Sequence, residues 1–211
     1  MKVVYKNRRT VKYDDVVFAE EEMENKRPSS FKGQFLTSMP ALLDPNFFQT
    51  VTCICEYTQA GTVGIVVNRV HPSITGKDIF EELNLQYKPE AESIPIHIGG
   101  PVHIGEIYLL HGPPFGCEGC LMITPSLAMS NTKDILAAVA TGRGPRSFIL
   151  TLGCAGWASG QLEGEILDNA WLIGPVHEEI IFDMPIEARW EAAMKKMGIN
   201  PAQLMDTAGH A

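Results

Sequence analysis

The stretch of residues 147–175 constrains the fold of this chain most. It begins with an apolar run, residues 147–152, which is typical of a buried strand. The small residues from Gly153 to Gly160 follow and predict a tight turn, with Trp157 in its middle. A helix of about three turns is expected from Gln161, before a second apolar run. A strand, a glycine turn and a polar helix start together favour a functional site.

The predicted helix carries a carboxylate among apolar side chains. At about 100° per residue, Glu163 falls within the apolar arc, Gln161 lies on the polar side and Asn169 lies at the boundary. The arc is formed by Leu162, Ile166, Leu167 and Ala170, and the polar side also holds Glu165 and Asp168. A carboxylate on an apolar face needs hydrogen-bond donors. Glu163 either folds back onto the free amides of the first turn, with Gly160 as N-cap, or acts as a polar anchor or proton acceptor in a pocket beside Trp157.

Composition limits the function classes. The 211 residues suit one large domain, or a domain with an appendage, and 45% are hydrophobic. The formal net charge of −8 works against direct nucleic-acid binding, which needs clustered Lys and Arg. No apolar segment approaches the ~18 residues that span a bilayer, and the N-terminus lacks the apolar core of a secretory signal. We therefore expect no membrane association and a cytoplasmic location, which fits the odd count of five cysteines.

The chain divides at about residue 30. Residues 1–30 hold a basic run, an acidic run and a linker-like Arg27-Pro28-Ser29-Ser30, so they read as an N-terminal extension or as an arm that docks on a partner. The globular domain is predicted over residues 31–211. Its strands are expected at residues 34–38, 50–58, 62–68, 94–98, 106–111, 121–124 and 179–182. Its further helices are expected from Thr75, from Asn131 or Thr132, and over 185–197. Strands that come mostly as hairpins predict an α+β fold with a mostly antiparallel sheet.

Cysteines and histidines offer several chemical alternatives. Cys117 and Cys120 form a CxxC that could be a redox pair or half a zinc site, but the loop lies between strands and lacks a second half. Cys154 could be a nucleophile, although no paired histidine can be placed. The histidines at 97, 103 and 111 could converge on a metal or lie on separate strands as ordinary residues. We expect neither a metal nor a cofactor.

Two further pairs could bind an anion. Gly99-Gly100 lacks the spacing of known phosphate loops and favours a tight turn or bulge. Asn68-Arg69 ends a strand with several donors, which could hold a carboxylate or phosphate. A structural salt bridge from Arg69 to Asp44, Glu163 or Glu165 is the alternative.

From Phe31 to its C-terminus the chain resembles the bacterial YqgE/AlgH family. The resemblance rests on Met39-Pro40, Asp44-Pro45-Asn46-Phe47, Gly64-Ile65-Val66-Val67-Asn68-Arg69, Gly99-Gly100-Pro101-Val102, Ala155-Gly156-Trp157, Gly160-Gln161-Leu162-Glu163, Asn169-Ala170-Trp171 and Arg189-Trp190. It implies an α+β fold with a bifurcated sheet curled into a pseudo-barrel with flanking helices. The family has no established activity and carries the label of transcriptional regulator. The N-terminal extension and the Cys117–Cys120 loop depart from its pattern.

The resemblance implies a binding site at the motif residues, namely Asn68, Arg69, Gly99, Gly100, Trp157, Gln161, Glu163 and Asn169. We expect a non-enzymatic regulatory protein that binds a small molecule or a protein partner there, with Trp157 as an anchoring surface. The alternative is a hydrolase or transferase for an anionic small molecule, with Glu163 as base and Asn68 and Arg69 orienting the substrate.

Overall fold

The computed structural model describes residues 30–116 and 119–202. Its strands are β1 (Gln34–Ser38), β2 (Val51–Thr58), β3 (Gly61–Val66), β4 (Val70–Thr75), β5 (Pro95–Ile98), β6 (Val102–His111), β7 (Leu121–Thr124), β8 (Leu127–Ser130), β9 (Phe148–Ala158) and β10 (Trp171–Pro175). Its helices are α2 (Gly76–Glu82), α3 (Lys133–Ala140), α4 (Gln161–Leu167), α5 (Glu178–Phe182) and α6 (Arg189–Lys196), with 3₁₀ turns at Pro89–Ala91 and Ile186–Ala188. The extension predicted over residues 1–30 lies outside the described residues, apart from Ser30.

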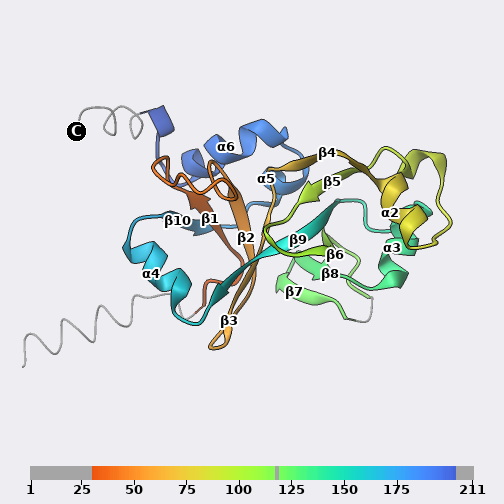
Figure 1. Ribbon diagram of the computed structural model, residues 1–211, viewed down its shortest axis with the longest axis horizontal. Helices are drawn as coiled ribbons and strands as arrows, with labels where there is room; N and C mark the ends of the chain where they lie inside the picture. Colours follow the sequence, from red (N-terminus) through yellow and green to blue (C-terminus); the bar gives the residue numbers. More distant parts are fainter. Residues whose placement is uncertain (1–29, 117–118, 203–211) are drawn as a thin grey trace, which may run out of the picture. The chain divides into compact units, whose positions relative to one another are not determined.

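The strands form one large, open sheet (Figure 1). The pairing order is β10-β1-β2-β3-β9-β6-β8-β7, with β5 joined to β9 and β4 joined to β5. All pairs are antiparallel except β5 with β9. The mixed fold and the mostly antiparallel sheet are therefore confirmed. The order does not close on itself, and the pseudo-barrel and the flanking helices stay predictions.

Strand pairing branches at β9. Its first half pairs with β5 and β6, whereas its second half, Ala155–Ala158, pairs with β3. Gly99 joins the two parts, because its amide donates to the Leu152 carbonyl of β9 and its carbonyl accepts from Val66 of β3, both at 2.8 Å. A Cβ atom on Gly100, whose φ is +148°, would lie 2.3 Å from the main-chain carbon of Cys154. Glycine is required here because two main chains cross in contact.

The turn predicted over 153–160 is wrong. β9 runs through to Ala158, because pairing with β3 holds residues 155–158 extended, and only Ser159 and Gly160 turn. Gly160 is the N-cap, as expected, with φ of +75°. The helix that follows has seven residues rather than about three turns. Trp157 therefore lies on a strand and is 5% exposed.

The other elements agree with the sequence in most places. The capping box of Thr75 with Asp78 is present, and Thr132 caps α3. The strand expected at 179–182 is wrong: helix α5 occupies the segment and buries Ile180 and Ile181 in the core. The helix expected over 185–197 begins with a 3₁₀ turn. β4 and β8 were not expected; each is short and is fixed by pairing with a neighbouring strand.

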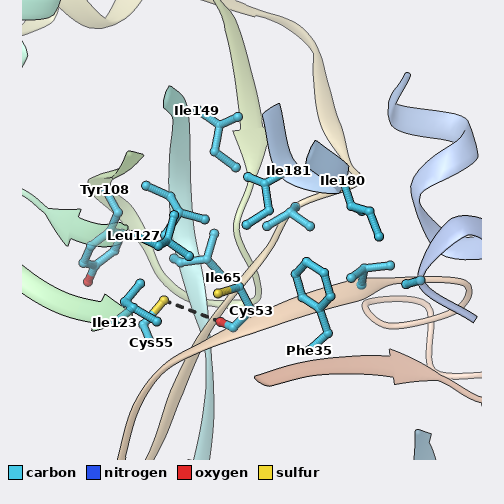
Figure 2. Close-up of a cluster of buried hydrophobic side chains, with 14 of the residues drawn as sticks. Phe35, Cys53, Cys55, Ile65, Tyr108, Ile123, Leu127, Ile149, Ile180 and Ile181 are labelled. Carbon is cyan, nitrogen blue, oxygen red and sulfur yellow. Dashed lines mark hydrogen bonds between the residues drawn. The ribbon is translucent and has the colours of Figure 1, made fainter. Parts of the chain in front are cut away.

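Three apolar clusters make up the core. The first lies between the sheet and helices α5 and α6, and includes Phe35, Cys53, Cys55 and Tyr108 (Figure 2). The second joins α2 and α3 to β5, β6 and β9. The third packs α4 on β1, β2, β9 and β10. In Figure 1, α4 lies at one end of this part of the chain and α2 and α3 lie at the other. In the described ranges, no helix has the length and apolar character needed to cross a membrane.

Candidate functional site

Asn68 holds the main chain of a neighbouring loop. It follows β3, and its side-chain oxygen accepts a hydrogen bond from the Val51 amide at 2.8 Å. Its side-chain nitrogen donates to the Gln49 carbonyl, also at 2.8 Å. Gln49 has φ of +51°, an unfavourable value for a residue with a side chain, and the amide of Asn68 stabilises that turn. Both ends of the Asn68 amide are thus engaged by the chain itself.

Arg69 holds the same loop at two other carbonyls. Its Nη1 donates to Pro45 at 2.6 Å and its Nη2 donates to Phe48 at 2.8 Å. These two main-chain carbonyls, rather than the alternative salt bridge to Asp44, Glu163 or Glu165, hold the Arg69 side chain. A planar guanidinium with several fixed donors suits this two-point contact. We call residues 44–49, clamped by Asn68 and Arg69, the braced loop.

The braced loop packs on two tryptophans that share one carboxylate. The Phe47 ring lies 5.9 Å from the ring of Trp157 and 5.4 Å from that of Trp171, measured between centroids. Both indole nitrogens donate to Oε2 of Glu165, at 2.9 Å and 2.8 Å. The amide of Gln161 donates to its Oε1 at 2.8 Å. Glu165 therefore joins Trp157, Trp171 and Gln161 in one hydrogen-bond network.

The sequence placed Glu165 on the polar side of the helix, as one alternative salt-bridge partner of Arg69, and its contact with the two indoles was not predicted. The signal that could have found it is the pair of tryptophans on either side of it in the sequence. Buried indole nitrogens need acceptors, and a half-buried carboxylate on the helix between the two strands is suited to supply one.

Glu163 has a different partner from those expected. Its carboxylate accepts a hydrogen bond from the hydroxyl of Tyr57 on β2, rather than from the first-turn amides. The bond to Glu163 raises the pKa of Tyr57, because the carboxylate stabilises the protonated phenol. The structure does not bring Glu163 and Arg69 to a common partner. The geometry thus gives no support to a reaction that uses Glu163 as base with Arg69 as substrate clamp.

Asn169, Gly99 and Gly100 allow main-chain conformations and contacts that most other residues would not tolerate. Asn169 follows α4 with φ of +57° and ends the helix in the left-handed conformation that asparagine tolerates. Gly99 and Gly100 allow the contact with β9 described above. The role of these residues in binding, like that of the other motif residues, stays a prediction.

The three histidines do not converge. His97 on β5 and His111 on β6 are both buried, at 2% and 0% exposure, and His103 is exposed. His111 contacts the Gly112 carbonyl and the Ser130 hydroxyl, at 2.7 Å and 3.0 Å. Burial, with the nearby charge of Arg189, lowers the pKa of His97 to about 4. Among residues 30–116 and 119–202, no group of three potential ligands could hold a metal ion. Cys117 lies outside the described residues, so the CxxC prediction stays untested.

A groove opens beside the paired segments of β3 and β9. Its volume is about 540 Å³, within the range of small-molecule sites. Gly61 and Gly156 line its floor. Its walls include Glu56 and Thr58 of β2, and Val102 and His103 of β6. We call this hollow the β3–β9 groove.

Two bulges shape the walls of the β3–β9 groove. The register of β2 on β3 shifts between Ile54 and Glu56, and that of β6 on β9 shifts between Val102 and Ile107. His103 lies in the second bulge with φ of +50°. Bulges and left-handed residues with side chains are common next to functional sites, where they redirect a side chain.

A chain of polar contacts leads from the wall of the groove to its floor. Nδ1 of His103 lies 3.3 Å from Oε1 of Glu106, and the Tyr108 hydroxyl donates to Oε2 of Glu106 at 2.7 Å. Tyr108 belongs to the same core cluster as Cys154, which lines the groove. Burial, together with the bond to Glu106, raises the pKa of Tyr108. Burial also raises the pKa of Cys154, so the thiol is protonated at neutral pH and is a poor nucleophile.

Comparison with known proteins supplies the family. The AlgH-like family model matches residues 35–202. The chain belongs to the AlgH-like family. A UPF0301 protein from Desulforapulum autotrophicum is 48% identical over 189 residues, which cover 90% of this chain and 100% of that protein.

Solved structures agree. The solution structure of the AlgH protein from Pseudomonas aeruginosa matches with a TM-score of 0.73 at 39% identity, over 88% of this chain and 98% of that one. A crystal structure of a Corynebacterium diphtheriae protein matches with a TM-score of 0.65 over 81% and 89% of the two chains. At 20% identity, it supports the fold alone. Asn68, Arg69, Phe47, Trp157 and Gln161 belong to one contact network, which holds the braced loop against β9 and β10.

Proposed function

We propose that this AlgH-like protein is a binding protein without turnover, and that the β3–β9 groove is its recognition site for a small molecule. The observation that carries the proposal is the groove itself. It has a glycine floor, ionisable side chains on two walls, and a bulge at each of those walls. A concave site of this size with a few polar groups is the usual form of a ligand pocket.

The chemistry of the groove supports binding rather than reaction. Its thiol, Cys154, has a pKa that burial raises, and it packs in the same core cluster as Tyr108. Its imidazole, His103, contacts Glu106. A cysteine nucleophile needs a base that removes its proton, and the contacts of Cys154 offer a phenol instead. A regulatory role would then follow from ligand-dependent contact with a partner protein.

Direct DNA binding is the less favoured route to regulation, because the formal net charge of −8 repels phosphate. A gel-shift assay at physiological salt checks this point. Retention of a duplex under those conditions would contradict the preference for a protein partner.

Native mass spectrometry of protein purified from its own host tests the groove. We expect the folded chain to retain a small molecule, and Gly156→Val to lose it. A Cβ on Gly156 meets only the Val102 side chain, at 3.5 Å, so valine fits the strand while its methyl groups fill the groove. The control is Gly164→Ala at an exposed position of α4, where a Cβ meets nothing within 4 Å. Equal retention by both variants would place the ligand elsewhere, and no retention by the parent protein would contradict the proposal.

A further inference from the structure

We propose that the ligand of the β3–β9 groove is a small organic amine, whose cationic nitrogen pairs with Glu56 while an apolar body covers the glycine floor. The inference rests on the proposed function and adds the chemical class of the ligand. Three features of the groove support it, namely an unpaired carboxylate, an oriented imidazole and a floor without side chains.

Glu56 is the carboxylate of the groove that has no partner. It is exposed on β2, and among the described residues no hydrogen bond or ion pair engages its side chain. The other acidic group nearby, Glu106, contacts His103 through one oxygen and Tyr108 through the other. Glu56 is therefore available for a ligand, whereas Glu106 is already engaged.

The bulge on β2 explains why Glu56 is found at this wall. The register shift between Ile54 and Glu56 adds a residue to β2 opposite β3 and changes the alternation of its side chains. Cys55 stays in the core at 0% exposure, while Glu56 is exposed beside the groove. With regular pairing, the alternation of side chains along β2 would continue, and Glu56 would not lie beside the groove.

His103 supplies a second polar contact from the β6 wall. Its Nδ1 lies next to Glu106, and its Nε2 has no partner among the described residues. The carboxylate of Glu106 limits the rotation of the ring, as a second carboxylate does for many functional histidines. The free nitrogen can exchange a hydrogen bond with a polar group on the ligand body.

The charge of the lining selects against anions. Of the residues that the structure describes, those that line the groove include Glu56 but neither lysine nor arginine. An anionic ligand would meet a carboxylate of like charge, and the formal net charge of −8 would add to the repulsion. The floor at Gly61 and Gly156, with Val63 and Val102 beside it, offers main chain and methyl groups to an apolar body. A compact amine with a ring or short alkyl chain matches both requirements.

An NMR titration of the full chain tests the inference with three probes that share a phenyl ring: phenethylamine, the neutral phenethyl alcohol and the anionic hydrocinnamate. Phenethylamine is expected to shift the amides of Gly61 and Gly156 at lower concentration than the other two probes. Glu56→Gln is expected to weaken the binding of phenethylamine by about two- to fivefold, the scale of an exposed ion pair, and to leave the binding of the alcohol unchanged. Glu82→Gln, at an exposed position on α2, is the matched control and should change nothing.

The outcomes separate the two proposals. Equal binding of all three probes in the groove, or an unchanged phenethylamine affinity in Glu56→Gln, would overturn the amine assignment and leave the groove as a binding site. Tighter binding of hydrocinnamate would overturn the assignment in the same way. If none of the probes shifts the groove amides, the amine assignment is overturned, and the retention of a ligand by the parent protein and by Gly156→Val still decides whether the groove is the binding site.

Discussion

Replacing Glu165 tests whether one carboxylate holds the tryptophan pair together. Trp157 and Trp171 are 5% and 4% exposed, and both donate their indole N–H to Oε2 of Glu165. Glu165→Leu keeps a side chain of similar length and removes both acceptors. Each buried donor left without a partner costs about 1–3 kcal/mol, so the expected loss is about 2–6 kcal/mol. That is a large part of the ~5–15 kcal/mol that stabilises a typical domain.

Glu165→Gln is the matched control. Because both indoles donate to the same oxygen, a glutamine carbonyl can accept both bonds, and only the contact with Gln161 is lost. We expect this variant to lose about 1 kcal/mol. The free energy of unfolding is measured by urea titration with far-UV circular dichroism, since indole fluorescence would report the substitution directly. The m-value should not change.

Two results would refute this reasoning. The first is a loss below about 1 kcal/mol in Glu165→Leu, which would mean that water or another group satisfies the indoles. The second is an equal loss in Glu165→Gln and Glu165→Leu, which would make the charge, rather than the acceptor, the stabilising feature.

Three further predictions concern positions away from the tryptophan pair. His97 is neutral in the folded chain, with a pKa near 4 against 6.5 when unfolded, so stability should fall by up to about 1.4 kcal/mol per pH unit as pH drops from 6.5 toward 4. His97→Leu should reduce that slope in urea titrations at several pH values, and an unchanged slope would assign it to other groups. Gly100→Ala should prevent soluble expression, because its Cβ would contact the Cys154 main chain, whereas Gly105→Ala, with open space around it, should leave the melting temperature unchanged. Arg69→Lys should speed hydrogen exchange in the braced loop, because an ammonium cannot span both carbonyls; unchanged protection would mean that the loop is fixed by other contacts.

Local sequence patterns determined much of the fold. The alternating run of β2 and β3 gave their hairpin, the Thr75–Asp78 box gave the start of α2, and Gly160 gave the start of α4. These features depend on neighbours a few residues away, so a single sequence carries them. The same reasoning failed at residues 153–158, where small residues favour a turn but pairing with β3 extends the strand.

The roles of the polar motif residues were decided by tertiary structure. Asn68 and Arg69 were recognised as donors, yet their acceptors are carbonyls about twenty residues earlier, brought within reach by the β2–β3 pairing. Glu163 was expected either to bind the amides of its own helix or to be a polar anchor beside Trp157, and its partner Tyr57 lies on strand β2. Helical periodicity reports which side of a helix a residue occupies and says nothing of which strand faces it.

The sequence by itself determined the α+β class and most of the strands, because these depend on short-range pattern, and its motifs carried the resemblance to the family that the family model confirms. The β3–β9 groove was decided only by the tertiary structure. Its walls come from β2 and β6, which flank the paired strands β3 and β9 and come from distant parts of the sequence, and its ionisable groups lie at two bulges. A bulge is an extra residue in one strand relative to its partner. It therefore exists only when the two strands are paired, and neither strand's sequence shows it alone.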